Sequence, residues 1–255
     1  MKTSTKLLIA FVAVIILSFI SYNYLLKRQY AAGNFVQNHT ADENTYVKIN
    51  LPEFSYVVID GKQTGGKGDS YTEYRTWMPH MSIKNNDTIK NNFVSVLSGY
   101  QDILQTKVKN DTLYVSFFNK RTALTSPYRD FWHDVIEIKA RKIKYISGRD
   151  ATFNYYAESP MNDSFVTAAT GFGIINLNNL QVTNLQTISN DDATINIEGN
   201  NNIGALNYNL YHKGILKINP AHIREFKAIH IDSLSKIIIN GNAPQVNKYL
   251  TDNIK

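Results

Sequence analysis

The stretch that decides the fold is Ala193-Thr194-Ile195-Asn196-Ile197, a small residue followed by two apolar residues at alternate positions. The same pattern begins again at Ala151, Gly173, Gly214 and Ser235, so that successive copies start about 21 residues apart. Self-similarity at a fixed period of roughly 20 to 50 residues is typical of solenoids, in which each repeat buries its apolar side against its neighbours.

Apolar side chains alternate within each copy, which is the period of a β-strand, and about 21 residues are too few for two helices and their turns. We therefore predict an all-β fold, a parallel β-helix-like solenoid of about five coils. Three aligned columns make chance alternation a poor alternative. The inward columns are Phe153, Ile175, Ile195, Leu216 and Ile237, then Tyr155, Leu177, Ile197, Ile218 and Ile239, while Asn154, Asn176, Asn196, Lys217 and Ile238 should point outward.

A second β-prone run follows each of the first four copies, at 165–168, 185–189, 206–210 and 226–231. The stretch 220–224 allows one turn of helix at most. Upstream, β-prone runs without a regular period suggest an irregular β cap. The predicted organisation is a signal anchor at 1–33, a tether and first strand at 34–53, the cap at 54–140, the solenoid at 141–246 and a tail at 247–255.

The anchor is predicted from Leu7 to Leu26, a run of 20 residues without a charge. At about 1.5 Å per residue, a helix of this length spans roughly 30 Å, the thickness of a bilayer core. The alternatives are a cleaved secretory signal and a buried core helix. Lys2 and Lys6 before the run give a weak bias toward a cytoplasmic N-terminus. We expect a single-pass membrane protein with its β domain outside the cytoplasm, on the periplasmic side of the inner membrane in a Gram-negative bacterium.

Charge and cysteine content exclude several function classes. The formal net charge is +6, but Lys2, Lys6, Lys27 and Arg28 flank the apolar run, and the other 23 basic and 21 acidic residues nearly balance. We therefore expect no nucleic-acid partner, because such a partner requires a basic patch or stripe. The chain has no cysteine, which excludes disulfides, thiolate metal sites and a cysteine nucleophile.

Four motifs resemble the bacterial auto-transporter adhesin head GIN domain family. An F-x-x-V start is matched at 54–57 and a D-T-L-x-V strand at 111–115. A V-x-I-x-A strand is matched at 135–140 and an I-x-G-x-P ending at 239–244, each with one extra residue. The Ser-Gly pair of the family coils is found here at Ser147-Gly148 but is missing from the other coils. The resemblance covers about 54–246 and implies a β-helix-like fold in the cell envelope.

No motif with a clear catalytic role emerges. Residues 61–68 have the spacing of a phosphate-binding loop, but Gly68 replaces the Ser or Thr that would hold magnesium. The six histidines form no zinc-like pair, and Asp191-Asp192 is an isolated acidic pair. A polysaccharide-active β-helix enzyme would need two carboxylates across a groove. The acidic residues of the repeats share no common phase: Asp150, Glu158, Asp163, Asp191, Asp192, Glu198, Glu225 and Asp232.

Three tyrosines are the candidate ligand contacts: Tyr156, Tyr208 and Tyr211. A tyrosine ring offers an apolar face with a polar tip, which suits sugars and peptides, although tyrosine is also simply a good strand residue. We expect no enzyme activity, cofactor or metal, and a role as a non-enzymatic binding, adhesion or structural module whose partner is a glycan or an envelope protein. The alternative is an accessory partner of an envelope-sensing membrane system. An outward strip of aromatics would favour ligand adhesion, and an uncapped end would favour a protein partner.

Overall fold

The structure is a computed structural model, and it describes residues 11, 15, 18–19, 21–24, 27–28, 45–64, 80–118, 134–161, 163–219 and 221–240. The chain divides into two compact units, Met1–Asn44 and Thr45–Lys255. In the first unit, the described residues are helical. Among the described residues, no helix has both the length and the apolar character needed to cross a bilayer. Most of the predicted anchor lies outside them, so the anchor stays a prediction.

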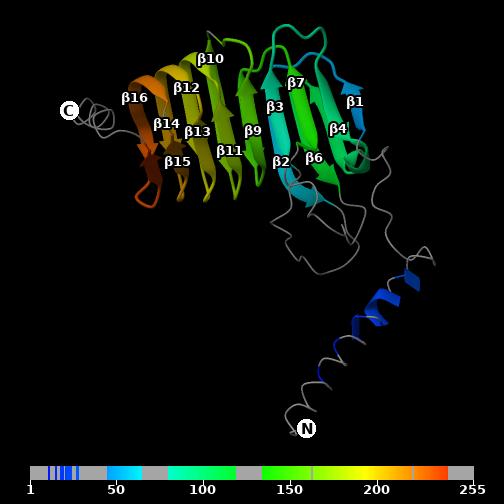
Figure 1. Cartoon of the computed structure of the whole chain (residues 1–255). Coiled ribbons are helices and arrows are strands. Elements are labelled where there is room, and N and C mark those ends of the chain that lie inside the picture. The colour runs from blue at the N-terminus through cyan, green and yellow to red at the C-terminus, as the bar shows by residue number, and fades with distance from the viewer. Residues whose placement is uncertain are drawn as a thin grey trace, which may run out of the picture. The chain divides into compact units, whose positions relative to one another are not determined.

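The second unit consists of two β-sheets that pack face to face (Figure 1). We call the nine-stranded sheet, in the order β1-β4-β7-β3-β9-β11-β13-β15-β17, sheet A, and the eight-stranded sheet, in the order β16-β14-β12-β10-β8-β2-β6-β5, sheet B. The strands of sheet A are β1 (Tyr46–Asn50), β3 (Met81–Asn85), β4 (Phe93–Leu97), β7 (Ile136–Ala140), β9 (Thr152–Ala157), β11 (Ile174–Asn178), β13 (Thr194–Glu198), β15 (Ile215–Ile218) and β17 (Lys236–Ile239). Those of sheet B are β2 (Tyr56–Thr64), β5 (Leu104–Lys109), β6 (Thr112–Phe118), β8 (Tyr145–Arg149), β10 (Ser164–Thr170), β12 (Gln181–Ser189), β14 (Asn202–Leu210) and β16 (His222–Ile231).

The repeats form a β-solenoid, as predicted. From β8 to β17 the chain alternates between the sheets, so that each coil places one strand in sheet B and the next in sheet A, and all these strands are parallel. Five such strand pairs are joined by about four turns of chain. The predicted columns are in register: Ile195 pairs with Ile175 and Leu216, and Leu216 pairs with Ile237.

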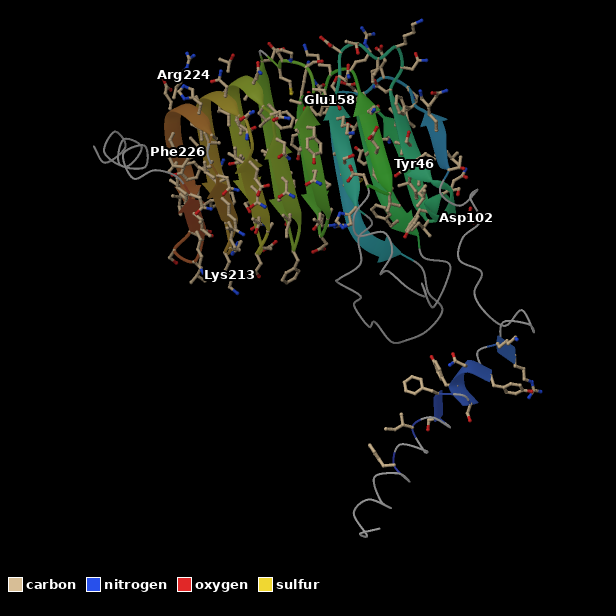
Figure 2. All side chains as sticks on the ribbon, viewed as in Figure 1. Tyr46, Asp102, Glu158, Lys213, Arg224 and Phe226 are labelled. Carbon is tan, nitrogen blue, oxygen red and sulfur yellow. The ribbon has the colours of Figure 1, made fainter. Side chains whose placement is uncertain are left out.

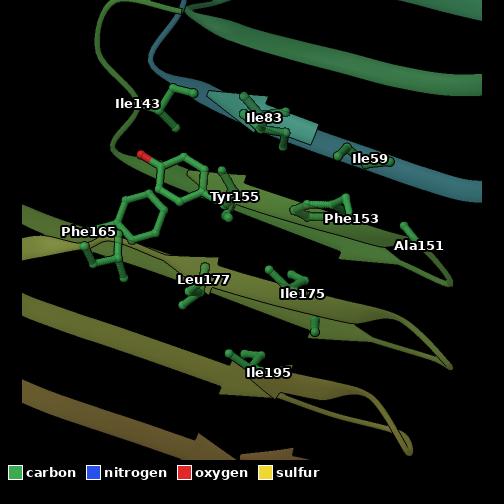
Figure 3. Close-up of a cluster of buried hydrophobic side chains, with 14 of the residues drawn as sticks. Ile59, Ile83, Ile143, Ala151, Phe153, Tyr155, Phe165, Ile175, Leu177 and Ile195 are labelled. Atoms are coloured by element: carbon green, nitrogen blue, oxygen red, sulfur yellow. The ribbon is translucent and has the colours of Figure 1, made fainter. Parts of the chain in front are cut away.

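The core lies between the two sheets. Strand alternation places one side chain in two on the inner face, and the side chains there are buried from Val57 and Ile83 through Ile195 and Leu216. Tyr155 of β9 and Phe165 of β10 stack across the core with ring centroids 4.8 Å apart (Figure 3). Burial raises the pKa of the Tyr155 hydroxyl, which donates a hydrogen bond to Met161 Sδ.

Tight corners connect the strands, and their backbones require residues that tolerate positive φ. Asn110 and Asp111 form the turn between β5 and β6, with φ of 50° and 60°. The coil corners repeat this at Asp150, Asn179 and Asp191. A corner side chain can also bind the next coil: Asp150 Oδ1 accepts a hydrogen bond of 3.0 Å from the Phe172 backbone N–H. Short polar residues therefore set the coil length of about 21 residues.

Two sequence-based expectations were wrong in detail. The predicted irregular cap at 54–140 instead extends both sheets: β2–β3 and β6–β7 form two further parallel strand pairs, and β1, β4 and β5 add antiparallel strands. The helical turn at 220–224 is absent from its described residues, because β16 begins at His222. Ile223 and Phe226 pair with Ile203 and Leu206 of β14, and burial of these side chains favours the strand.

The order of the strand pairs differs from their order in the sequence. The pair β2–β3 lies between β6–β7 and β8–β9, so β2 pairs with both β6 and β8. Residues 141–144 connect β7 to β8 and so pass the strand pair β2–β3 that lies between them. Here the Ile143 backbone N–H donates a hydrogen bond of 3.0 Å to Oδ1 of buried Asn85. The residues that the structure describes between 45 and 240 therefore share one core, although the predicted boundary at 140 divides them.

Candidate binding surfaces

The three candidate tyrosines lie apart from one another. Tyr156 is half-buried on the outer face of sheet A, in register with Lys84 and Asn178. Tyr211 lies at a corner, where its ring stacks on His230 with centroids 4.5 Å apart. The prediction that Tyr208 contacts a ligand was wrong. Its side chain points into the core, is 5% exposed and packs against Phe226. The parity of β14 places it in a column with Thr187, so its ring is not available to a ligand.

A different set of tyrosines lies on the outer face of sheet B, two of them exposed and one half-buried. Tyr56, Tyr114 and Tyr145, which we call the tyrosine patch, come from the adjacent strands β2, β6 and β8. Tyr56 and Tyr114 are 40% and 45% exposed. These are large values for aromatic side chains in the middle of a sheet, since such rings normally bury most of their area. The patch is therefore the most conspicuous aromatic surface on the described strands of sheet B.

Strand register sets the geometry of the patch. Tyr56 is directly opposite Tyr145, and their ring centroids are 6.1 Å apart with planes inclined by 42°. Tyr114 is opposite Val58, the next outward residue after Tyr56 on β2, so it lies diagonal to Tyr56. Neighbouring strands in a sheet are about 4.8 Å apart, so the three tyrosines lie on one face of three consecutive strands, with the rings of Tyr56 and Tyr145 in contact.

Polar groups border the patch on several sides. The Arg149 guanidinium forms an ion pair with Asp60 on the neighbouring strand, and its Nε donates a 3.2 Å hydrogen bond to Asp60 Oδ1. This hydrogen bond raises the pKa of Arg149. Beyond β8, the outward row that contains Tyr145 continues through Val166 to the side-chain amides of Gln186 and Asn207. The patch thus combines apolar rings with both charged and neutral hydrogen-bonding groups.

The outer face of sheet A is polar instead. Asn176 Nδ2 donates a hydrogen bond of 2.8 Å to Asn154 Oδ1, and Asn196 Nδ2 donates one of 2.6 Å to Asn176 Oδ1. We call these three residues the asparagine ladder, and they occupy the outward positions that the sequence predicted. Their amides are engaged with one another, which indicates that the ladder stabilises the sheet.

A charged cluster continues sheet A toward β7. Glu137 accepts hydrogen bonds from Lys84 Nζ at 2.7 Å and Lys139 Nζ at 2.8 Å. Burial tends to raise the pKa of Glu137, but these two bonds outweigh burial and the pKa lies below its ordinary value. Lys48 Nζ lies 3.8 Å from the centre of the Phe93 ring nearby. These charges are largely satisfied by one another, so the cluster is better explained as a structural feature than as a ligand site.

The other predicted chemical features have structural explanations. Asp191 and Asp192 have positive φ at a coil corner. Asp191 accepts a hydrogen bond from the Thr170 hydroxyl, and Asp192 lies 4.0 Å from Lys213 Nζ. Within the described residues, no group of three or more His, Asp and Glu side chains could hold a metal ion. Of the loop at 61–68, residues 61–64 belong to β2 and the others lie outside the described part of the chain.

The tyrosine patch leaves only a weak signal in the sequence. Each of its tyrosines is next to a buried residue, namely Val57, Leu113 and Ile146, so period-two alternation alone places all three outward. Alternation does not show that the rings meet, because β6, β2 and β8 are neighbours in an order that the sequence does not follow.

No family model and no curated protein matches this chain. It is similar to the crystal structure of a "putative adhesin" from Bacteroides fragilis, with 14% identity, 77% of this chain and 93% of that chain covered, and a TM-score of 0.47. A "putative lipid binding protein" from Parabacteroides distasonis is 11% identical over 77% of this chain and 96% of its own, with a TM-score of 0.39. A "putative cell adhesion protein" from Clostridium sporogenes is 10% identical over 72% and 99%, with a TM-score of 0.31. We draw no functional conclusion from likenesses this distant, and the resemblance to the GIN domain family stays a prediction.

Proposed function

We propose that this protein is a non-enzymatic binding module of the cell envelope, and that it binds a glycan through the tyrosine patch. The observation that carries this proposal is the exposure of Tyr56 and Tyr114 beside Tyr145 on three adjacent strands of sheet B. Exposed contiguous aromatic surface is costly to keep in water, and it commonly marks an interaction site.

Sugar chemistry matches this surface better than a purely apolar ligand does. A sugar ring presents C–H groups on its faces and hydroxyls around its edge. Tyrosine rings can pack against the C–H faces while their own hydroxyls stay hydrated. Gln186, which follows Tyr145 and Val166 in the same outward row, and the Arg149–Asp60 pair, further along β8 and β2, offer donors and acceptors to a glycan that extends beyond the rings.

A sheet also suits an extended ligand. The described strands of sheet B keep the rings on a regular backbone, whose hydrogen bonds fix their spacing. Such rings lose little freedom on binding, which limits the entropic cost of association. The uncharged run from Leu7 to Leu26 supports a location at the envelope, where a membrane-tethered module would meet surface polysaccharides.

Binding of the full chain to an array of bacterial and host glycans, followed by calorimetry on the glycans retained, tests this proposal. We expect the double variant Tyr56→Ala/Tyr145→Ala to bind about tenfold more weakly or worse, which corresponds to about 1.4 kcal/mol. Tyr56→Phe/Tyr145→Phe keeps both rings and should retain most of the affinity. Tyr156→Ala, on the outer face of sheet A, is the matched control and should bind like the wild type.

Two results would overturn the proposal. One is the absence of any glycan bound by the folded wild-type chain. The other is equal affinity of the wild type and Tyr56→Ala/Tyr145→Ala, which would place the ligand elsewhere on the molecule.

A further inference from the structure

The tyrosine patch has a basic border on one side, formed by strand β5. This strand is the last of sheet B, next to β6, and Asp102 just before it lies at the end of the second unit opposite Phe226 (Figure 2). Val108 of β5 packs against the core, so strand alternation turns Lys107 and Lys109 to the outer face, and both are exposed. The lysines and the tyrosines therefore share one face of sheet B.

The register of β5 brings these lysines next to the rings. Lys107 is directly opposite Tyr114. Lys109 is opposite Thr112, which is in turn opposite Tyr56. Side chains directly opposite each other in an antiparallel pair have Cβ atoms about 5 Å apart, and a lysine carries its charge on a flexible four-carbon stem. The ammonium group of Lys107 can therefore reach a ligand that packs on the Tyr114 ring.

The charges of the two lysines are available to a ligand. Within the part of the chain that the structure describes, neither Lys107 nor Lys109 belongs to an ion pair, whereas Arg149 on the other side of the patch is paired with a carboxylate of β2. Asp102 and Asp111 lie in the turns at the two ends of β5 rather than on the strand. The border of the patch at β5 thus presents two uncompensated positive charges beside aromatic rings.

We infer that the glycan bound by the tyrosine patch is acidic, and that Lys107 and Lys109 contact its anionic groups. This inference rests on the proposed function and adds the chemical class of the ligand. The rings pack against the C–H faces of the sugars, while the ammonium groups meet carboxylate or sulfate substituents at the sugar edges. Charge complementarity of this kind also steers the ligand to the site.

The spacing of the strands sets the size of the ligand. Tyr145 on β8 and the lysines on β5 are separated by three strand intervals, which amount to about 14 Å. A single sugar does not span this distance, so a glycan that contacts both is an oligosaccharide or a longer chain.

Matched pairs of acidic and neutral glycans test the inference on the full chain. Oligogalacturonates are compared with their carboxyl-reduced forms, and sulfated galactan oligosaccharides with their desulfated forms, which also distinguishes the two anionic groups. We expect the wild type to bind the acidic member of at least one pair about tenfold more tightly in about 0.05 M salt. The preference should fall to about twofold in about 0.5 M salt, because salt screens exposed charges.

Lys107→Gln/Lys109→Gln should bind the acidic glycan about threefold to tenfold more weakly and the neutral one like the wild type, because exposed ion pairs are individually weak. Lysines on an end strand also protect it from pairing with another chain, a role that a charge of either sign fulfils. Lys107→Glu/Lys109→Glu should therefore stay monomeric in size-exclusion chromatography but bind the acidic glycan even more weakly. Asp111→Asn, which changes a charge at the same hairpin and tolerates positive φ, should not weaken binding.

The outcomes separate this inference from the proposed function. The inference alone is overturned if the folded chain binds only neutral glycans, binds both members of each pair equally, or keeps its acidic preference in Lys107→Gln/Lys109→Gln. The proposed function itself fails if no glycan binds, or if Tyr56→Ala/Tyr145→Ala binds every glycan as the wild type does.

Discussion

The Nδ2 atom of Asn196 lies 2.6 Å from Oδ1 of Asn176, although twenty residues separate the two in the sequence. The contact exists because one coil is about 21 residues long and the strands β11 and β13 are in register. Asn176 in turn donates to Asn154, so a single side chain joins three successive coils. The asparagine ladder therefore adds side-chain hydrogen bonds between coils to the backbone hydrogen bonds between their strands.

Asn176→Ala removes both hydrogen bonds of this residue while leaving the strand backbone intact. A typical intramolecular hydrogen bond contributes about 1 kcal/mol net, so we expect a loss of about 1 to 2 kcal/mol in the free energy of unfolding. Urea denaturation followed by circular dichroism measures the change. Asn200→Ala, at an exposed corner, is the control and should stay within about 0.5 kcal/mol of the wild type. Equal effects of the two variants would contradict a stabilising ladder.

Gly214 is buried at the small inward position that begins a coil. A Cβ atom at this position would overlap the backbone oxygen of Ser189, and backbone cannot move aside as a flexible side chain can. Overpacking of this kind commonly costs roughly 1 to 3 kcal/mol, and we expect Gly214→Val to lower the thermal midpoint accordingly.

Gly199→Asn is the matched control for Gly214→Val. Gly199 has φ of +74°, which asparagine tolerates, and a Cβ atom there would have its nearest neighbours 3.7 Å away. This variant should unfold close to the wild-type temperature. A thermal midpoint for Gly214→Val that equals the wild type would show that the coil has room at this position.

The regular coils from β8 to β17 could be predicted because the pattern that specifies each strand lies within a few consecutive residues and recurs at a constant spacing. Alternation identifies the inward side chains, such as Ile195, and the constant spacing aligns them between coils. The placement of β2–β3 could not be predicted in this way. Asp60 meets Arg149 across 89 residues, and no periodic signal links their two strands. The tyrosine patch could not be predicted for the same reason, since its three tyrosines lie on neighbouring strands only through that long-range pairing.

The alternation of apolar and polar residues also fails to identify inward positions where the core side chain is itself polar. Thr167 and Thr187 pair in register inside the core, and their buried hydroxyls have no hydrogen-bond partner within the described residues. A buried hydroxyl without a partner typically costs about 1 to 3 kcal/mol, so the isosteric change Thr187→Val should leave stability unchanged or raise it by up to about 1 kcal/mol.

Thr170→Val provides the contrast for Thr187→Val, because the Thr170 hydroxyl donates a hydrogen bond of 3.2 Å to Asp191 Oδ2. Chemical denaturation should place the midpoint of Thr170→Val below that of the wild type, and the midpoint of Thr187→Val at or above it. A destabilised Thr187→Val would mean that its hydroxyl has a partner in solution.

The predicted anchor from Leu7 to Leu26 can be tested by separating membranes from the soluble fraction of cells. An uncharged run of 20 residues is long enough to remain in a bilayer, so the full chain should stay with membranes after a carbonate wash. A chain that begins at Asn34 should be recovered in the soluble fraction. N-terminal sequencing of the cellular protein distinguishes the alternative, since a soluble product that begins near Gly33 would establish a cleaved signal peptide.

The last prediction concerns the pH dependence of stability at Glu137. Its hydrogen bonds from Lys84 and Lys139 hold its pKa in the folded state below the ordinary value of 4.5. The unfolded chain therefore binds the proton more tightly, so the contribution of Glu137 is fully present above that value and is lost as the pH falls through the lower folded-state pKa. Glu137→Gln should cost about 1 kcal/mol at pH 7, where it leaves two lysines beside a neutral side chain.

The difference between wild type and Glu137→Gln should shrink when urea denaturation is repeated below about pH 4, because the wild-type carboxylate is then protonated as well. Glu53→Gln is the control: Glu53 is exposed and lies 3.8 Å from Arg141 in a loose ion pair, so this change should have little effect at either pH. A cost for Glu137→Gln that stays constant from about pH 7 to about pH 3 would show that charge at Glu137 does not stabilise sheet A.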